Sequence, residues 1–273
     1  MTHAIRIHQT GGPEVLSWEE VAVPAPAVGE ATVRHHAVGL NFIDTYHRTG
    51  LYPLPLPAGI GLEGAGVVEA VGAGVTEVKV GDRVAYAGGP VGAYAEVRNI
   101  PAHRLLKLPD AIAFDTAAAM MLQGLTAAYL LRRTYRVQPG DAVLIHAAAG
   151  GVGLIACQWA KALGVRMIGT VSSDEKAALA RAHGCAETIV YTREDFVARV
   201  KALTGGAGVP VVYDSIGKDT FFASLDCLRP LGRHVQVGLP TGHTARMEIH
   251  MNAVYMKQLA VCGTRGMPAW RYP

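Results

Sequence analysis

The stretch His-Ala-Ala-Ala-Gly-Gly-Val-Gly at residues 146–153 lies between an apolar run, Val-Leu-Ile at 143–145, and a helical pattern. Apolar residues recur at helical spacing after the glycines, at Val152, Ile155, Trp159 and Leu163. A glycine-rich turn between a strand and a helix predicts a dinucleotide-binding turn. Gly150 and Gly151 let the backbone approach a pyrophosphate, and Gly153 lets the helix pack against the strand. The alternative is a tight turn that binds nothing.

A second glycine pattern, Gly-Ile-Gly-Leu-Glu-Gly at 59–64, matches the same spacing by letter. A proline-rich loop at 52–57 precedes it, and the predicted strand follows it instead of leading into it. In the turn at 146–153, by contrast, only the first glycine of the usual motif is replaced, by Ala148. We therefore interpret the glycines at 59–64 as turn and packing residues.

Strands and helices alternate after the turn. The strands are expected at 142–146, 166–171, 188–191, 211–214, 234–238 and 259–263, and the helices at 151–163, 174–183, 194–203 and 218–228. Such alternation predicts a doubly wound parallel sheet with helices on both faces, and six strands complete a Rossmann dinucleotide-binding domain. We expect this α/β domain over residues 126–263.

The chain before residue 114 is different, because short β-type runs alternate with turn residues there. The runs lie at 4–8, 31–38, 65–71 and 93–98. Frequent short strands favour a barrel or a sandwich. A long, Ala-rich helical pattern at 114–131 joins this part to the α/β part, so we place the domain boundary at residue 125.

Composition excludes several classes of protein. Half of the 273 residues are hydrophobic and 17% are charged, the opposite of a disordered chain. The net charge of +3 is scattered, which gives no basic patch for nucleic acid or an anionic membrane. No window approaches the roughly 18 consecutive apolar residues of a membrane span. The N-terminus lacks an apolar signal segment and the four cysteines form no close pair, so we expect a cytoplasmic protein with reduced thiols.

The residues after the second strand of the α/β domain bear on the choice between NAD and NADP. NAD enzymes place an Asp or Glu near this strand tip to bind the ribose 2′-hydroxyl. Here the tip carries Ser172 and Ser173, and Lys176 follows in the first turn of a helix. A cation is unfavourable near the N-terminus of a helix, and a bound 2′-phosphate would offset that cost. This favours NADP, with Tyr191 near the adenosine. The alternative is that Asp174 reaches the ribose and Lys176 is a solvated lysine.

The combined motifs resemble the medium-chain dehydrogenase/reductase superfamily and, within it, the zinc-independent, ζ-crystallin-like quinone oxidoreductases. The segments that carry this resemblance are 11–16, 39–46, 50–53, 81–84, 124–127, 147–153 and 212–217. The resemblance implies an N-terminal GroES-like β-barrel domain over 1–125 that carries the substrate site. It also implies NADPH as the cofactor of the Rossmann domain, and a homodimer.

The resemblance also implies roles for individual residues. Asn41 and Tyr46 would face the nicotinamide and the substrate as catalytic residues, although both side chains could instead only cap their own loop. The cofactor-binding residues it implies, together with those of the glycine turn and strand tip, are Asn41, Thr126, Gly150, Gly151, Val152, Gly153, Ser172, Ser173, Lys176, Tyr191 and Ser215.

The same superfamily contains zinc alcohol dehydrogenases. By the resemblance, Asn41 takes the place of their first zinc-binding cysteine, and Leu62 takes the place of a histidine ligand in Gly-Leu-Glu at 61–63. No cysteine lies in residues 86–103, where a structural zinc lobe would need a set of them. We therefore expect no metal.

Without a Lewis acid to polarise a simple ketone, an easily reduced acceptor is the better substrate. We expect transfer from the nicotinamide of NADPH to a small quinone. One alternative is an enoyl or alkenal reductase that acts on activated C=C bonds, and another is a non-catalytic NADPH-binding remnant. RNA binding, which is ascribed to some relatives, is disfavoured by the scattered positive charge. The sequence leaves open the physiological acceptor and whether one or two electrons are transferred.

The resemblance weakens towards the C-terminus. Family members usually continue past residue 273, so we expect residues 264–273 to begin a return to the first domain whose remainder is missing. The loop at 238–242, Gly-Leu-Pro-Thr-Gly, lacks the Asn and Ser often found there. Both departures bear on substrate choice and on the first domain, and neither affects the nucleotide fold.

Overall fold

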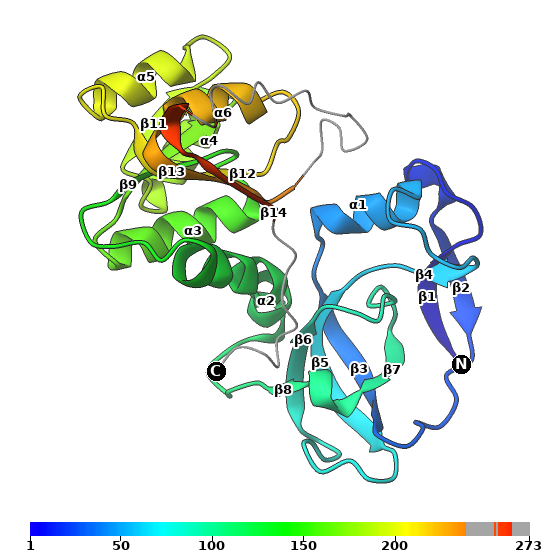
Figure 1. Cartoon of the computed structure of the whole chain (residues 1–273). Helices are drawn as coiled ribbons and strands as arrows, with labels where there is room; N and C mark the ends of the chain where they lie inside the picture. Colours follow the sequence, from blue (N-terminus) through cyan, green and yellow to red (C-terminus); the bar gives the residue numbers. More distant parts are fainter. Residues whose placement is uncertain (239–253, 255, 264–273) are drawn as a thin grey trace. The chain divides into compact units, whose positions relative to one another are not determined.

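The computed structural model describes residues 1–238, 254 and 256–263 (Figure 1). The chain divides after Leu125 into two compact units, one within Met1–Leu125 and the other within Thr126–Gly266. The loop residues 239–242 and the final segment 264–273, which depart from the family pattern, lie outside the described residues. None of the described helices is long and apolar enough to cross a membrane.

The second unit is built on a six-stranded sheet with the order β11-β10-β9-β12-β13-β14. These strands are β9 (Ala142–Ile145), β10 (Arg166–Val171), β11 (Glu187–Val190), β12 (Val209–Asp214), β13 (Leu228–Gln236) and β14 (Ala260–Gly263). Every neighbouring pair is parallel. The strand order reverses between β9 and β12, which is where doubly wound sheets bind ligands at their carboxyl ends. The predicted Rossmann fold is confirmed.

Helices cover both faces of this sheet. They are α3 (Gly151–Ala162), α4 (Asp174–Ala182), α5 (Phe196–Leu203) and α6 (Phe221–Cys227). Figure 1 shows α3 on the face opposite to α5 and α6. Central strands covered on both faces need continuous apolar sequence, and Val143, Leu144 and Ile145 of β9 are at most 3% exposed.

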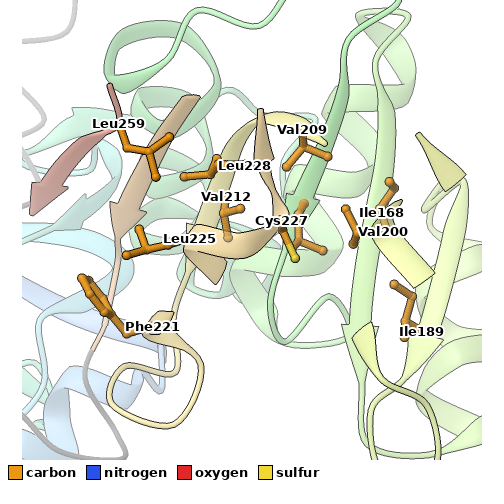
Figure 2. Close-up of a cluster of buried hydrophobic side chains, with 11 residues drawn as sticks. Ile168, Ile189, Val200, Val209, Val212, Phe221, Leu225, Cys227, Leu228 and Leu259 are labelled. Carbon is orange, nitrogen blue, oxygen red and sulfur yellow. The ribbon is translucent and has the colours of Figure 1, made fainter. Parts of the chain in front are cut away.

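Figure 2 shows the apolar cluster on the face that α5 and α6 cover. Its members are Leu144, Ile168, Ile189, Val200, Val209, Val212, Phe221, Leu225, Cys227, Leu228 and Leu259. Each fully buried side chain of this size contributes roughly 1.5–3 kcal/mol relative to exposure. This packing holds the strand ends, and therefore the residues that follow them, in fixed positions.

The first unit is β-rich and antiparallel, as expected for a GroES-like domain. One sheet has the order β7-β3-β5-β6-β8 and the other β2-β1-β4. The strands are β1 (Thr2–Ile7), β2 (Ser17–Val21), β3 (Glu30–Val38), β4 (Ala58–Gly59), β5 (Glu63–Val71), β6 (Arg83–Ala87), β7 (Val97–Pro101) and β8 (Leu106–Lys107). Buried apolar residues such as Val33, Val84 and Ile100 fill its interior.

Two helices matter for the first unit's site. The helix α1 (Phe42–Thr49) follows β3 and ends at Gly50, whose φ of 81° is left-handed and suits glycine. The helix α2 (Phe114–Tyr129) begins in the first unit and continues into the second. A π-helical turn, Leu130–Thr134, follows it.

Two strands differ from the sequence prediction. The strand expected at 93–98 begins only at Val97, because the main chain just before it hydrogen-bonds to β1 of the other sheet, where Ile5 N–H donates to Tyr94 O and Glu96 N–H donates to His3 O. The strand expected at 234–238 begins at Leu228, although its register against β12 jumps from Leu228 to Arg233. The residues between them are mostly exposed, and Leu231 among them has a positive φ of 63°. They form a turn within the strand, and for this reason their sequence did not predict a strand.

Candidate active site

The glycine turn joins β9 to α3 and has the features of a turn that could hold a pyrophosphate. Gly150 is the N-cap of this helix, and as a glycine it has no side chain that could cap the N–H groups of the first turn. The first N–H groups of a helix have no partner within it, so they are available to an anion here. Gly153 is buried, and a Cβ at this position would lie 2.5 Å from the carbonyl oxygen of Ala147. Only glycine allows the helix to approach the turn this closely.

A buried polar network lies at the end of β9, next to this turn. The two ring nitrogens of His146 lie 2.8 Å from Thr170 Oγ1 and 2.9 Å from Ser224 Oγ. Ser224 Oγ donates to Asp214 Oδ2 at 3.1 Å, and Nε2 of His234 lies 3.3 Å from the same oxygen. These side chains are at most 2% exposed. The network therefore ties the end of β9 to β10, β12, β13 and α6.

Burial controls the charges in this network. It lowers the pKa of His146 to about 4, so the imidazole is neutral at physiological pH. Burial alone would raise the pKa of Asp214, but hydrogen bonds from His234 and from the main-chain N–H groups of Ile216 and Gly217 hold it well below its usual range. A charged Asp214 thus closes the turn that follows β12. Ser215 in that turn donates to the His146 carbonyl oxygen at 3.3 Å.

The tips of β10 and β11 carry the residues predicted to hold a 2′-phosphate. Ser173 caps α4, because its Oγ accepts the N–H of Lys176 at 3.3 Å. Ser172 is partly exposed, and Tyr191 is exposed at the end of β11. Asp174 forms two hydrogen bonds with Arg193, at 2.5 and 2.6 Å. The structure thus brings the predicted residues together and adds Arg193, which the sequence analysis did not select.

In the first unit, Asn41 is the N-cap of α1 and is 7% exposed. Its Nδ2 donates to Glu63 Oε2 at 2.6 Å, and its Oδ1 accepts from Gln123 Nε2 at 3.4 Å. Its own N–H donates to Asp44 Oδ2 at 3.0 Å. Asn41 is therefore held by hydrogen bonds to α1, β5 and α2.

Glu63 is a central residue of this site that the sequence analysis did not select. It is fully buried, and its second carboxylate oxygen accepts the N–H of Leu122 at 2.7 Å. Burial raises its pKa, and the hydrogen bonds from Asn41 and Leu122 oppose that rise. The signal that could have identified it is the acid of Gly-Leu-Glu at 61–63, which follows directly on the leucine that replaces the histidine ligand.

Tyr46 lies one turn along α1 from Asn41, in a group of aromatic side chains. Its ring centroid is 5.5 Å from that of Phe42 and 5.3 Å from that of Tyr52, both in edge-on contact. Phe42 is 62% exposed and Tyr52 is 42% exposed. The helix that Asn41 caps thus also carries exposed aromatic surface.

The predicted residues lie in four places. Gly150, Gly151, Val152, Gly153 and Ser215 gather at the ends of β9 and β12, and Ser172, Ser173, Lys176 and Tyr191 gather at the tips of β10 and β11. Asn41 and Tyr46 lie on α1 in the first unit, and Thr126 lies in the part of α2 that belongs to the second unit. Among the described residues, no group of three or more His, Cys, Asp or Glu could hold a metal ion.

Comparisons with known proteins show which family this chain belongs to. Residues 27–110 match the family model of the alcohol dehydrogenase GroES-like domain, and residues 151–272 match that of the zinc-binding dehydrogenases. The chain is 58% identical over 243 residues to a quinone oxidoreductase of Pseudomonas aeruginosa, across 89% of this chain and 75% of that protein. This chain belongs to the quinone oxidoreductases. The resemblance to this branch of the medium-chain dehydrogenase/reductase superfamily is confirmed.

Other members of the family are similar over the same length. A structure of the Escherichia coli quinone oxidoreductase complexed with NADPH superposes with a TM-score of 0.93 at 50% identity, covering 96% of this chain and 81% of that one. A 2-haloacrylate reductase of a Burkholderia species is 51% identical over 249 residues, across 89% of this chain and 74% of that protein. The relatives thus include reductases of two acceptor classes.

Proposed function

We propose that this quinone oxidoreductase transfers a hydride from NADPH to a small quinone without zinc. The observation that carries the proposal is the hydrogen bond from Asn41 Nδ2 to Glu63 Oε2 at 2.6 Å. It occupies the amide of Asn41, which by the family resemblance stands where the related alcohol dehydrogenases have their first zinc-binding cysteine. A site of this kind acts by orienting its reactants.

The second unit supports NADPH as the hydride donor. The uncapped N-terminus of α3 and the glycine at position 153 suit a pyrophosphate, and the polar tips of β10 and β11 suit the phosphorylated ribose. NADPH supplies the hydride, and the protein fixes its position. The E. coli relative complexed with NADPH has the same fold and supports this assignment.

The first unit favours a neutral, planar acceptor. The exposed aromatic group of Phe42, Tyr46 and Tyr52 offers ring faces and edges on which a quinone can stack. A quinone is planar and uncharged, so it needs no charged partner there, whereas a 2-haloacrylate carries a carboxylate that favours a cationic partner. The aromatic group therefore favours a quinone over a 2-haloacrylate.

Asn41 and Tyr46 have different roles in this proposal. Asn41 is fixed by Glu63 and Gln123 and orients the nicotinamide side of the site. Tyr46 donates a proton to the reduced acceptor oxygen. We expect Tyr46→Phe to lower kcat by about tenfold or more, the loss typical of a general acid. An unchanged kcat would mean that solvent, and not Tyr46, supplies the proton.

Steady-state kinetics with two acceptors test the substrate class. NADPH oxidation should be faster with a small naphthoquinone than with 2-chloroacrylate, and Phe42→Leu should raise KM for the quinone several-fold while leaving the KM of the acrylate unchanged. Thr45→Ser, a change on the same helix outside the aromatic group, is the matched control. Preference for the acrylate would move the assignment to the C=C reductases, and NADPH binding without turnover of either would favour a non-catalytic protein.

The remaining sequence-based expectations stay predictions. They are a substrate domain over residues 1–125, an NADPH domain over 126–263, a homodimeric assembly and a cytoplasmic location. Sedimentation of the purified protein at several concentrations tests the assembly directly.

A further inference from the structure

We propose that the ion pair between Arg193 and Asp174 sets the preference of the site for a 2′-phosphorylated dinucleotide over its unphosphorylated counterpart. This inference rests on the proposed NADPH function and names the residues that would select the phosphate. The sequence motifs point only to Ser172, Ser173, Lys176 and Tyr191 for this role, so Arg193 is a further specificity-determining residue.

Main-chain contacts hold Arg193 against the tip of β10. The N–H of Tyr191 donates to the carbonyl oxygen of Val171 at 3.1 Å, and Thr192 Oγ1 donates to the carbonyl oxygen of Ser172 at 3.3 Å. The segment after β11 therefore runs alongside the start of α4. Arg193, the next residue, is placed beside Asp174 by the backbone and not only by its flexible side chain.

The pair occupies both oxygens of the Asp174 carboxylate. Arg193 Nη2 donates to Oδ1 at 2.5 Å and Nη1 donates to Oδ2 at 2.6 Å. An aspartate near this strand tip would otherwise accept the ribose hydroxyls of NADH, as in NAD enzymes. Because each oxygen already accepts a hydrogen bond from a cation, Asp174 is a poor acceptor for a ribose diol.

The pair also changes the charge that a phosphate meets. The first turn of α4 contains two carboxylates, Asp174 and Glu175, and one ammonium group, Lys176, which is an unfavourable balance for a phosphate dianion. Arg193 neutralises Asp174 and keeps further N–H groups, since a guanidinium has five. With Arg193 in place, Lys176 and the remaining N–H groups of Arg193 can both donate hydrogen bonds to the phosphate.

Equilibrium binding of NADPH and NADH to the full chain, followed by nicotinamide fluorescence, tests the proposal. Arg193→Gln leaves an unpaired carboxylate, so we expect its Kd for NADPH to rise about tenfold and its Kd for NADH to stay the same or fall. Asp174→Asn keeps the cation, so its Kd for NADPH should stay the same or fall and its Kd for NADH should not change. The double variant should recover part of the NADPH affinity lost in Arg193→Gln, because the carboxylate is gone.

A matched control is available on α5. Arg199 pairs with Glu194 at 3.0 Å in a similarly exposed ion pair, and Arg199→Gln should leave the ratio of the two dissociation constants unchanged. Equal weakening of NADPH and NADH by Arg193→Gln would overturn the proposal. So would a loss of NADH affinity in Asp174→Asn, since it would mean that Asp174 already binds the ribose.

The result separates this proposal from the function on which it rests. Wild-type protein that binds neither dinucleotide would contradict the proposed function itself. Wild-type protein that prefers NADPH, with an Arg193→Gln variant that keeps the same preference, would contradict only the role of the ion pair. If Arg193→Gln did not fold, as judged by its melting temperature, the nearly isosteric Asp174→Asn would decide the matter through its two dissociation constants.

Discussion

Glu63 is a buried carboxylate whose free energy depends on pH. Its raised pKa means that the native state binds the proton more tightly than the unfolded chain does. The stability that this proton contributes is present below the ordinary glutamate pKa of about 4.3 and is lost as the pH rises through the raised native value. A charged Glu63 is kept in place by the donors Asn41 and Leu122.

We therefore predict that the stability difference between Glu63→Gln and the wild type changes with pH. The variant should be less stable by about 1–3 kcal/mol under acidic conditions, because the amide N–H of the glutamine would face the N–H donor of Asn41 or Leu122 and neither group would have an acceptor. The difference should shrink as the pH rises to neutral, because only the wild type then holds a buried charge. Urea unfolding between pH 4 and pH 8 measures it, and a difference that is independent of pH would contradict the shift.

Single residues were predicted unevenly from the sequence. Asn41 and Tyr46 stood out because their segment is a recognisable motif. Glu63 did not, because its importance comes from partners that lie 22 and 59 positions away in the chain. Arg193 was missed for the same reason, since its partner Asp174 lies on a different element, 19 positions away. Pairings of this kind follow from the fold and leave no local pattern.

At the scale of elements, the turn between β9 and α3 assigns different tasks to its glycines. A Cβ at position 153 would lie 2.5 Å from the Ala147 carbonyl oxygen, whereas a Cβ at position 150 would lie 3.2 Å from the same atom. The first contact requires the helix to move, and the second needs only a small adjustment. Gly153 therefore serves packing, while the packing at Gly150 leaves room for the role proposed for it in the approach of a ligand.

These contacts predict that the two alanine variants separate stability from binding. Gly153→Ala should lower the free energy of unfolding by about 1–3 kcal/mol, as overpacking does. Gly150→Ala should change stability by less than about 1 kcal/mol yet weaken NADPH binding, because in the proposed site the pyrophosphate needs a close approach to the backbone at this position. Thermal melting and fluorescence titration of both variants check this, and equal effects on stability would contradict the division of tasks.

The end of β12 depends on a charged aspartate. Because its pKa is held low in the native state, Asp214 contributes stability above the ordinary aspartate pKa of about 3.9, and this contribution is lost as the pH falls through the lower native value. Asp214→Asn should cost about 3 kcal/mol at neutral pH and less in acid. Asp226→Asn, an exposed change on α6, is the matched control and should stay within about 0.5 kcal/mol. Equal losses at both pH values would contradict this account.

The order and type of the Rossmann elements could be read from the sequence, because buried parallel strands have continuous apolar runs and the helices between them have helical periodicity. The boundaries of β7 and β13 could not. The main chain at residues 94–96 pairs with β1 of the other sheet, and the register of β13 against β12 jumps between Leu228 and Arg233. In both places tertiary contacts outweigh the local pattern.

At the scale of the whole molecule, the two units contribute different parts of the proposed site. The Rossmann unit offers a phosphate-binding turn and a polar strand tip, and the GroES-like unit offers Asn41, Glu63 and an aromatic surface. Together these residues support a reductase that positions its reactants and needs no metal to do so. The sequence motifs predicted the two fold types, while the hydrogen bonds of Glu63 with Asn41 and Leu122 emerged only from the fold.

The most direct test of the central claim is NADPH oxidation with a small quinone by protein treated with a strong chelator, with its zinc content measured on the same sample. We predict turnover that is unchanged by the chelator, at a zinc content far below one ion per chain, and slower turnover with NADH. Activity that disappears on chelation and returns with added zinc would contradict the zinc-free site built on Asn41 and Glu63.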